Sequence, residues 1–223
     1  DHPLEATLSA LPSLYLVDLQ GQRLGPTSAN RFAEALKAAH DFGQLRITAL
    51  HLADNRFGDV GAGEIAEAAL LSSGDMCRDT DIRQEIASVG CLHLLDLSWN
   101  QIGPAGAASI ASAMVHATRP LRALDLECNN VADTGTIALA AALPKAMSLI
   151  RLRLGGNRIG PIGAEALAPA LARSQVTSLD LSRNCLGARG ILALATTLRS
   201  SPKIQSLFLA VNRIGNEGVQ ALA

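Results

Sequence analysis

The stretch "LDLSWNQIGPAG" (residues 95–106) decides the fold, because its pattern recurs along the whole chain. It joins an alternating Leu-x-Leu core to an asparagine and a glycine-rich turn. Further copies are "LVDLQGQRLG" (16–25), "LHLADNRFG" (50–58), "LDLECNNVA" (124–132), "LRLGGNRIG" (152–160), "LDLSRNCLG" (179–187) and "LFLAVNRIG" (207–215). A unit that returns at a near-constant interval indicates a solenoid of stacked repeats.

Each copy changes its hydrophobic period from two to about 3.6 residues. The Leu-x-Leu core alternates as a strand does. The stretches that follow the turn, such as "GAASIASAMV" (106–115), space their apolar residues by three and four, which is typical of a packed helix. Pro104 and Pro161 stand where a first helical turn tolerates proline. The sequence predicts a right-handed α/β solenoid, an open horseshoe of about seven repeats. A parallel sheet forms its concave face and helices form its convex face.

The repeated pattern LxxLxLxxNxIGxxGAxxLAxxL resembles the ribonuclease-inhibitor class of leucine-rich repeats. Relatives of that class include the sensors of nucleotide-binding leucine-rich-repeat receptors, the tropomodulin cap and the activating protein of the GTPase Ran. The resemblance covers almost the whole chain and implies this fold. It says little about function, because the shared motif residues are structural.

Two intervals depart from the regular repeat. About five residues are added around 38–43, and a longer polar insertion is expected at 70–90, where Asp81 and Gln84 could cap a short helix over 82–87. Neither end shows a polar capping element, which solenoids need. We therefore expect 1–223 to be a single leucine-rich-repeat domain that is a segment of a longer protein.

Composition narrows the classes of function. The 19 basic and 20 acidic residues give a net charge of −1, so a general affinity for nucleic acid or anionic lipid gains no support. The longest apolar run, at 137–143, is too short to span a membrane. The cysteines, which show no C-x-x-C spacing, are Cys77, Cys91, Cys128 and Cys185. We expect reduced thiols, no metal, no cofactor and a cytoplasmic protein.

The repeated asparagines are predicted to be structural. A buried amide at a strand-to-loop bend can both donate to and accept from backbone groups that would otherwise lack partners. An active site would need one such residue, whereas the position recurs as Asn55, Asn100, Asn129, Asn157, Asn184 and Asn212.

Catalytic motifs gain no support, so we expect neither an enzyme nor a small-molecule substrate. The glycine-rich turns lack the G-K-[ST] of a phosphate-binding loop, and no serine lies in G-x-S-x-G. The resemblance raises one alternative, a regulatory GTPase-activating module that uses a loop arginine. Arg56, Arg158 and Arg213 all follow the asparagine, however, which favours a repeat feature. A structural subunit of a large cytoskeletal or ciliary assembly is a second alternative.

The concave face carries the leading hypothesis, a non-catalytic scaffold that binds a protein partner. Seven central side chains would form a row on the order of 29 Å long, at about 4.8 Å per strand. Trp99, the single tryptophan, is of a type enriched at interface hot spots. The alternatives are a solvated surface with weak ion pairs and, for Trp99, packing against the next repeat. The candidate partner-binding residues are His51, Asp96, Trp99, Asp125, Glu127, Arg151, Arg153, Asp180, Arg183 and Phe208.

Overall fold

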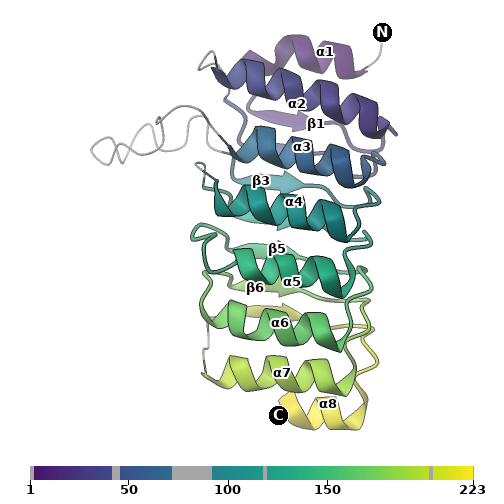
Figure 1. Ribbon diagram of the computed structural model, residues 1–223, viewed down its shortest axis with the longest axis vertical. Helices are drawn as coiled ribbons and strands as arrows, with labels where there is room; N and C mark the ends of the chain where they lie inside the picture. The colour runs from purple at the N-terminus through teal and green to yellow at the C-terminus, as the bar shows by residue number, and fades with distance from the viewer. Residues whose placement is uncertain (1–2, 42–45, 72–91, 118–119, 201–202, 223) are drawn as a thin grey trace, which may run out of the picture.

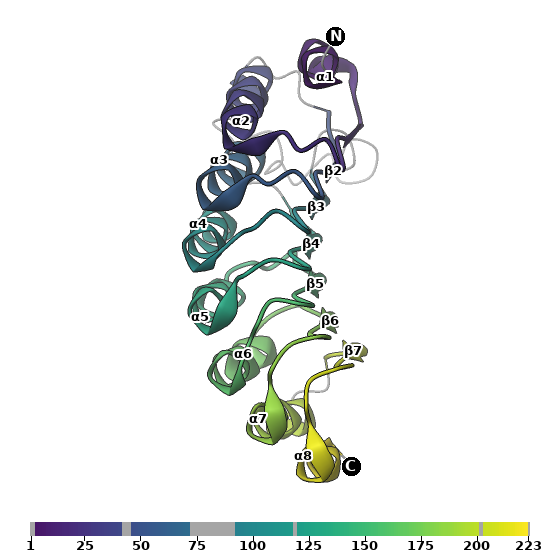
Figure 2. The same cartoon turned by 90° about the vertical axis from the view of Figure 1, so that its right-hand side faces the viewer.

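A computed structural model describes residues 3–41, 46–71, 92–117, 120–200 and 203–222. The chain forms two layers along one axis, with the termini at opposite ends (Figure 1). Strands lie on one side and the helices after residue 24 on the other, the first helix lies at the N-terminal end above the strands, and the stack curves toward the strands (Figure 2). The fold is the predicted α/β solenoid, with a parallel sheet on its concave face.

The seven strands of the described chain pair in sequence order, each with the strand of the next repeat. Every strand has three residues, and the middle residue points into the core while its neighbours face outward. The strands are β1 (Leu16–Asp18), β2 (Ala49–His51), β3 (Leu94–Asp96), β4 (Ala123–Asp125), β5 (Arg151–Arg153), β6 (Ser178–Asp180) and β7 (Ser206–Phe208).

All helices except the first cover the other face of the sheet and pack mainly against their neighbours in sequence. Their inner faces consist mainly of alanine, leucine and isoleucine, which join the strand leucines in one core. They are α1 (Pro3–Ala10), the 3-10 turn η1 (Leu11–Ser13), α2 (Gly25–Asp41), α3 (Gly58–Leu70), α4 (Pro104–Val115), α5 (Ala132–Ala142), α6 (Pro161–Ala172), α7 (Gly187–Ser200) and α8 (Gly215–Leu222).

The two expected irregularities have different outcomes. Of the extra residues expected near 38–43, those up to Asp41 belong to α2, which has 17 residues compared with 11–14 in α3 to α7, and 42–43 lie outside the described residues. Of the insertion expected at 70–90, Leu70 ends α3 and is buried. Residues 72–90, including the helix and cap expected at 81–87, lie outside the described residues.

Some helix starts are capped by an aspartate of the preceding repeat, which we did not predict. The Gly103 N–H, at the start of α4, donates to Asp59 Oδ1 at 2.5 Å. Likewise, Asp133 Oδ1 accepts from Gly160 and Gly163, at the start of α6, at 2.7 and 2.9 Å. These carboxylates provide partners for amides that have none within their own helix.

All six repeated asparagines are buried. Asn129 shows the arrangement: its Oδ1 accepts from the Asn100 and Ile102 N–H groups at 2.9 Å. Its Nδ2 donates to the Leu97 and Leu126 carbonyls, both at 3.0 Å. One amide therefore joins two successive repeats. The equivalent first-repeat residue, Gln22, is exposed and donates only locally, to the Gln20 carbonyl.

The residue before each asparagine adopts a left-handed backbone. Trp99 has φ +57° and Cys128 has φ +56°, although non-glycine residues rarely occupy this region. The conformation is held by a hydrogen bond to the next repeat, as when the Trp99 N–H donates to the Glu127 carbonyl at 2.9 Å. Trp99 thus stands in a turn whose geometry the repeat imposes.

Asn157→Ala tests the asparagine ladder. The change removes bonds from Nδ2 to the Leu126 carbonyl (2.7 Å) and from the Val131 N–H to Oδ1 (3.2 Å). Because buried backbone groups lose their partners, we expect the free energy of unfolding to fall by about 3 kcal/mol. Urea unfolding measures it. Gln22→Ala is the control and should change stability by less than about 0.5 kcal/mol. Equal stability of the two variants would contradict the ladder.

Candidate functional site

The strand register places the predicted central row on the concave face. Each member lies opposite the next, so the row is continuous across the sheet. In order it contains Asp18, His51, Asp96, Asp125, Arg153, Asp180 and Phe208. Arg151 belongs to a parallel row two residues earlier, while Glu127, Trp99 and Arg183 lie in the turns that follow the strands.

The aspartates of this row also shape their own turns, which the sequence analysis did not foresee. Asp96 Oδ1 accepts from the Ser98 N–H at 2.9 Å and from the Ser98 hydroxyl at 2.7 Å. Asp125 Oδ1 accepts from the Glu127 N–H at 2.9 Å. Asp180 does the same for Ser182 at 2.8 Å. One oxygen of each carboxylate is therefore engaged in a local turn.

Arg153 binds the acidic side chains on both sides of it. It donates to Asp125 Oδ2 at 2.6 Å and to Glu127 Oε2, and its Nε lies 4.0 Å from Asp180 Oδ2. The sequence placed acidic and basic groups next to one another here, and the structure joins them in one network. We call Asp125, Glu127, Arg153 and Asp180 the ion-paired cluster.

Burial and charge shift the ionisation of this cluster. Burial raises the pKa of Asp125, and the negative charge of Asp96 adds to the effect, against the opposing attraction of Arg153. For Arg153, burial acts to lower the pKa, but the carboxylates of Asp125, Glu127 and Asp180 outweigh it and raise the pKa. The charged form of each group is therefore favoured by the opposite charges next to it.

Outside the cluster, several predicted residues remain accessible. Trp99 is 57% exposed, Phe208 is 53% exposed, and both Arg151 and Arg183 are exposed, whereas His51 is only partly so. Tyr15, just before β1, is also exposed, and its hydroxyl accepts from the Arg46 guanidinium at 3.4 Å. We did not predict Tyr15. Its position directly before the first Leu-x-x-Leu segment is the sequence feature from which it could have been predicted.

The loop arginines share a backbone feature of the repeat. Arg56, Arg158 and Arg213 have φ values of +59°, +58° and +53°, and Gln101 at the equivalent position has +60°. The three arginines therefore share one backbone conformation at equivalent positions of the repeat, and no arginine differs from the other two in this respect. This agrees with their interpretation as a repeat feature.

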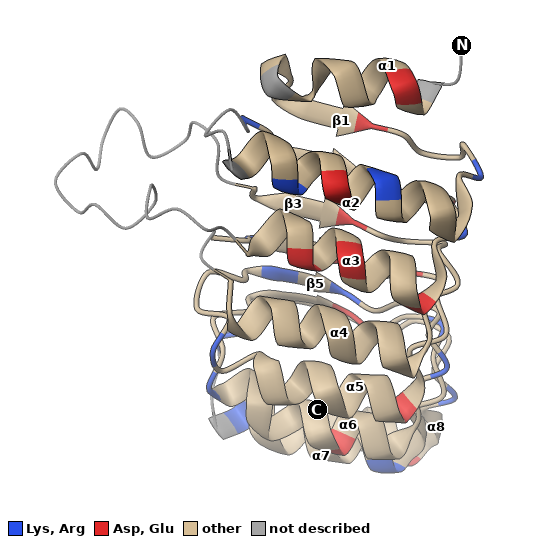
Figure 3. Ribbon diagram, turned by 45° about the horizontal axis from the view of Figure 1, so that its top comes forward, with Lys and Arg blue, Asp and Glu red and all other residues tan. Residues whose placement is uncertain are grey.

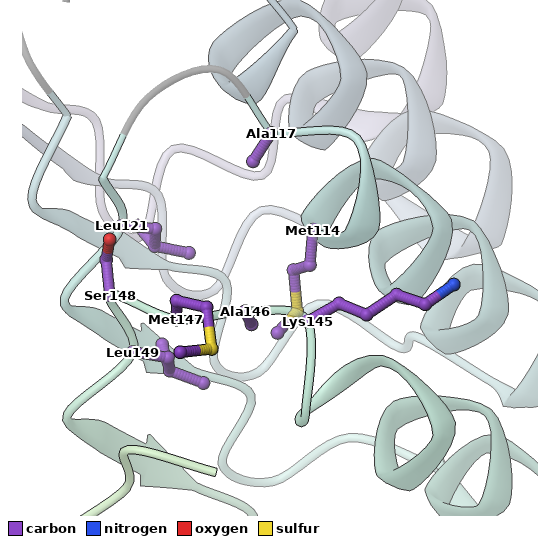
Figure 4. A pocket seen from close by; sticks show the side chains of 8 residues that line it. All are labelled: Met114, Ala117, Leu121, Lys145, Ala146, Met147, Ser148 and Leu149. Carbon is purple, nitrogen blue, oxygen red and sulfur yellow. The ribbon is translucent and has the colours of Figure 1, made fainter. Parts of the chain in front are cut away.

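A small pocket lies away from the concave row (Figure 4). It has a volume of about 140 Å³ and is found where α4 and α5 lead back toward the sheet, lined by Met114, Leu121, Lys145 and Met147 among others. No predicted partner-binding residue lines it.

Other chemical groups in the described part of the chain are few. Within residues 3–41, 46–71, 92–117, 120–200 and 203–222, no three histidine, cysteine or acidic side chains gather as metal ligands would. Cys128 and Cys185 are free thiols. Burial, together with nearby Glu127, raises the pKa of Cys128, so its reactive thiolate is disfavoured. None of the helices described is both long and apolar enough to cross a bilayer.

Comparison with known proteins settles the family. Six segments, which together make up more than half of the chain, match the family described as "Leucine Rich repeat": 47–66, 91–111, 119–140, 145–168, 175–195 and 200–223. The chain belongs to the leucine-rich-repeat family. Its repeats are of the ribonuclease-inhibitor type, as the resemblance implied.

Two curated relatives are ribonuclease inhibitors. The chain is 30% identical to that of Sus scrofa over 187 residues, which cover 78% of the chain and 41% of the inhibitor. It is 29% identical to that of Mus musculus over 144 residues, 64% of the chain and 32% of the inhibitor. The leucine-rich-repeat chain thus spans less than half the length of these relatives.

A solved structure titled "Leiomodin-1 Actin-Binding Site 2 (ABS2)" is similar in fold. The TM-score is 0.51 at 16% identity, with 91% of this chain and 88% of that chain covered. At this identity the likeness concerns the fold alone.

Arg153→Gln tests the ion-paired cluster. Asp125 has a raised pKa in the folded state, so its contribution to stability is complete below about pH 3.9 and is lost as the pH rises through the folded pKa. Without Arg153 that pKa rises further and the loss grows. Because Arg153 is 43% exposed to screening, we expect a deficit of only about 1 kcal/mol near pH 7.

That deficit should shrink toward about pH 4, because a higher pKa makes Asp125 take up its proton earlier in the variant as the pH falls. Urea unfolding at the two pH values measures both. Arg151→Gln is the matched control, because Arg151 pairs with no acidic group among the described residues. A deficit independent of pH would contradict the role given to Asp125.

Proposed function

We propose that this leucine-rich-repeat chain is a non-catalytic scaffold that binds a protein partner through its concave face. One observation carries the proposal: the exposed aromatic side chains of the described chain lie in the strands or in the segments directly beside them, and not in the helices. Tyr15, Trp99 and Phe208 are exposed there, whereas Phe32 and Phe57, in or next to helices, are buried. Aromatic residues are enriched among interface hot spots.

The ion-paired cluster supports a division of roles on this face. Its members form hydrogen bonds with one another and with the backbone of the local turns. We therefore assign them the role of stabilising the surface. Trp99, Arg151, Arg183 and Phe208 carry the contacts with the partner. His51 and Asp96, the two members of the central row that precede the cluster, complete the surface.

The relatives are consistent with a protein-binding role. Ribonuclease inhibitor, by its name, acts on another protein, and its repeats are of the same type. We also propose a cytoplasmic location, because an exposed free thiol such as Cys185 is best preserved in a reducing compartment.

Trp99→Ala combined with Phe208→Ala tests the proposal. Both side chains are about half exposed, so the fold should survive, and circular dichroism checks this. We expect a partner captured from the source cell and quantified by mass spectrometry to be lost at least tenfold, since each hot-spot truncation costs about 1–2 kcal/mol.

The control removes exposed apolar side chains from the helical face. Ile162→Ala combined with Leu192→Ala changes residues of α6 and α7 that are comparably exposed. Capture should be unaffected by this pair. Capture lost only in the helical variant would place the binding surface on the convex face and overturn the proposal.

A further inference from the structure

The two parts of the chain before and after position 144 have opposite net charge, and we call them the acidic half and the basic half. Residues 1–143 contain 17 acidic and 9 basic side chains, whereas residues 144–223 contain 3 acidic and 10 basic ones. The net charge of −1 conceals this division. In a solenoid, residues distant in sequence are also distant in space, so the basic half forms the end of the stack that carries β5 to β7 (Figure 1).

Two cations of the basic half lie on the sheet side without an acidic partner. Arg151 is the first residue of β5, exposed and in register with Ser178. Arg183 is exposed in the turn after β6, where its N–H donates to the Ala210 carbonyl at 2.7 Å. Neither forms an ion pair with the described residues, unlike Arg153 and the Arg189 of α7, which binds Glu165.

The surface around these arginines carries small side chains, the Asp180 carboxylate and an aromatic ring. Ser178 and Ser206 continue the row of Arg151, and Gly155, Ser182 and Ala210 lie in the turns beyond the strands. Phe208 stands among them, and Val211 in the turn after β7 is 74% exposed. The basic residues of β5 are visible on its ribbon in Figure 3.

We propose that the sheet face over β5 to β7 binds an extended acidic segment of the partner protein. Arg151 and Arg183 contact its carboxylates, and Phe208 packs against an apolar residue between them. The assignment rests on the concave-face function proposed above and specifies the chemistry of the partner.

The spacing of the arginines sets the spacing of the acidic groups. Arg151 is in register with Ser178, the first residue of β6, and Arg183 lies in the turn that follows β6. A peptide that contacts both arginines therefore extends over the length of β6 and into this turn, which takes several extended residues at roughly 3.3 Å each. The segment carries an acidic group at each end of this stretch, with an apolar residue between them.

The distribution of acidic residues favours a peptide over a nucleic acid. Asp180 stands in the central row between Arg153 and Phe208, and the row continues into Asp125 and Asp96. A nucleic acid carries a negative charge on every nucleotide, so some of its phosphates would be repelled by these carboxylates. A peptide with an apolar centre can place its charges only at the two arginines, so charge complementarity selects it.

The test measures binding of a synthetic peptide, Glu-Glu-Glu-Leu-Leu-Glu-Glu-Glu, to the 223-residue chain by fluorescence anisotropy. The centres of its two acidic triplets are five residues apart. We expect Arg151→Gln combined with Arg183→Gln to weaken binding about tenfold, and Phe208→Ala to weaken it about fivefold. Raised salt should weaken binding to the unmodified chain.

Arg173→Gln combined with Arg189→Gln is the control, because it removes the same charge from the helix side of the same half. If both double variants weakened peptide binding equally, net charge alone would explain the effect, and the proposal would be overturned. Tighter binding of a Lys-Lys-Lys-Leu-Leu-Lys-Lys-Lys peptide, or of a twelve-nucleotide single strand, would also overturn it.

The two proposals fail in different ways. If the partner captured from cells depends on Trp99 and Phe208 but not on Arg151 and Arg183, the concave-face function stands and the acidic segment is wrong. If capture depends on none of these residues, the function itself is wrong.

Discussion

The rest of the structure depends on a buried amide that belongs to two repeats at once. Asn184 Oδ1 accepts from Asn157 and Ile159 of the preceding repeat, both at 2.9 Å, and its Nδ2 donates to the Leu154 and Leu181 carbonyls. Only a side chain with both a donor and an acceptor can satisfy these groups. Because the amide leaves no freedom of register, each strand must align with the next, residue for residue.

This alignment turns a one-dimensional repeat into a defined surface. Equivalent positions on neighbouring strands stand about 4.8 Å apart, so any charge introduced at the central position meets the charges of both neighbours. Arg153 stands between Asp125 and Asp180 for this reason, and it pairs with them. Repulsion among adjacent carboxylates at the centre of the sheet is thereby relieved by one arginine.

The repeat could be predicted from the sequence because its signal is copied in every unit. The leucines, the asparagines, the proline starts of α4 and α6 and the order of the central row all follow from aligning the copies. Contacts between copies could not be predicted in this way. Asp59 caps the helix of the next repeat, Asp96 folds its own turn around Ser98, and Arg153 binds Glu127 from a neighbouring strand. Each depends on side-chain geometry that a repeat alignment does not contain.

The division of charge shows a different reason for an incomplete prediction. The uneven distribution of charge is present in the sequence, but the net charge of the whole chain conceals it. A net charge describes the surface well only where folding brings distant segments together. A compact domain mixes them, whereas a solenoid keeps them in order. The excess of acidic residues before position 144 and the excess of basic residues after it therefore remain in different parts of the stack. A partner that spans this surface meets an electrostatic gradient along the axis, so its orientation is selected before any single contact forms.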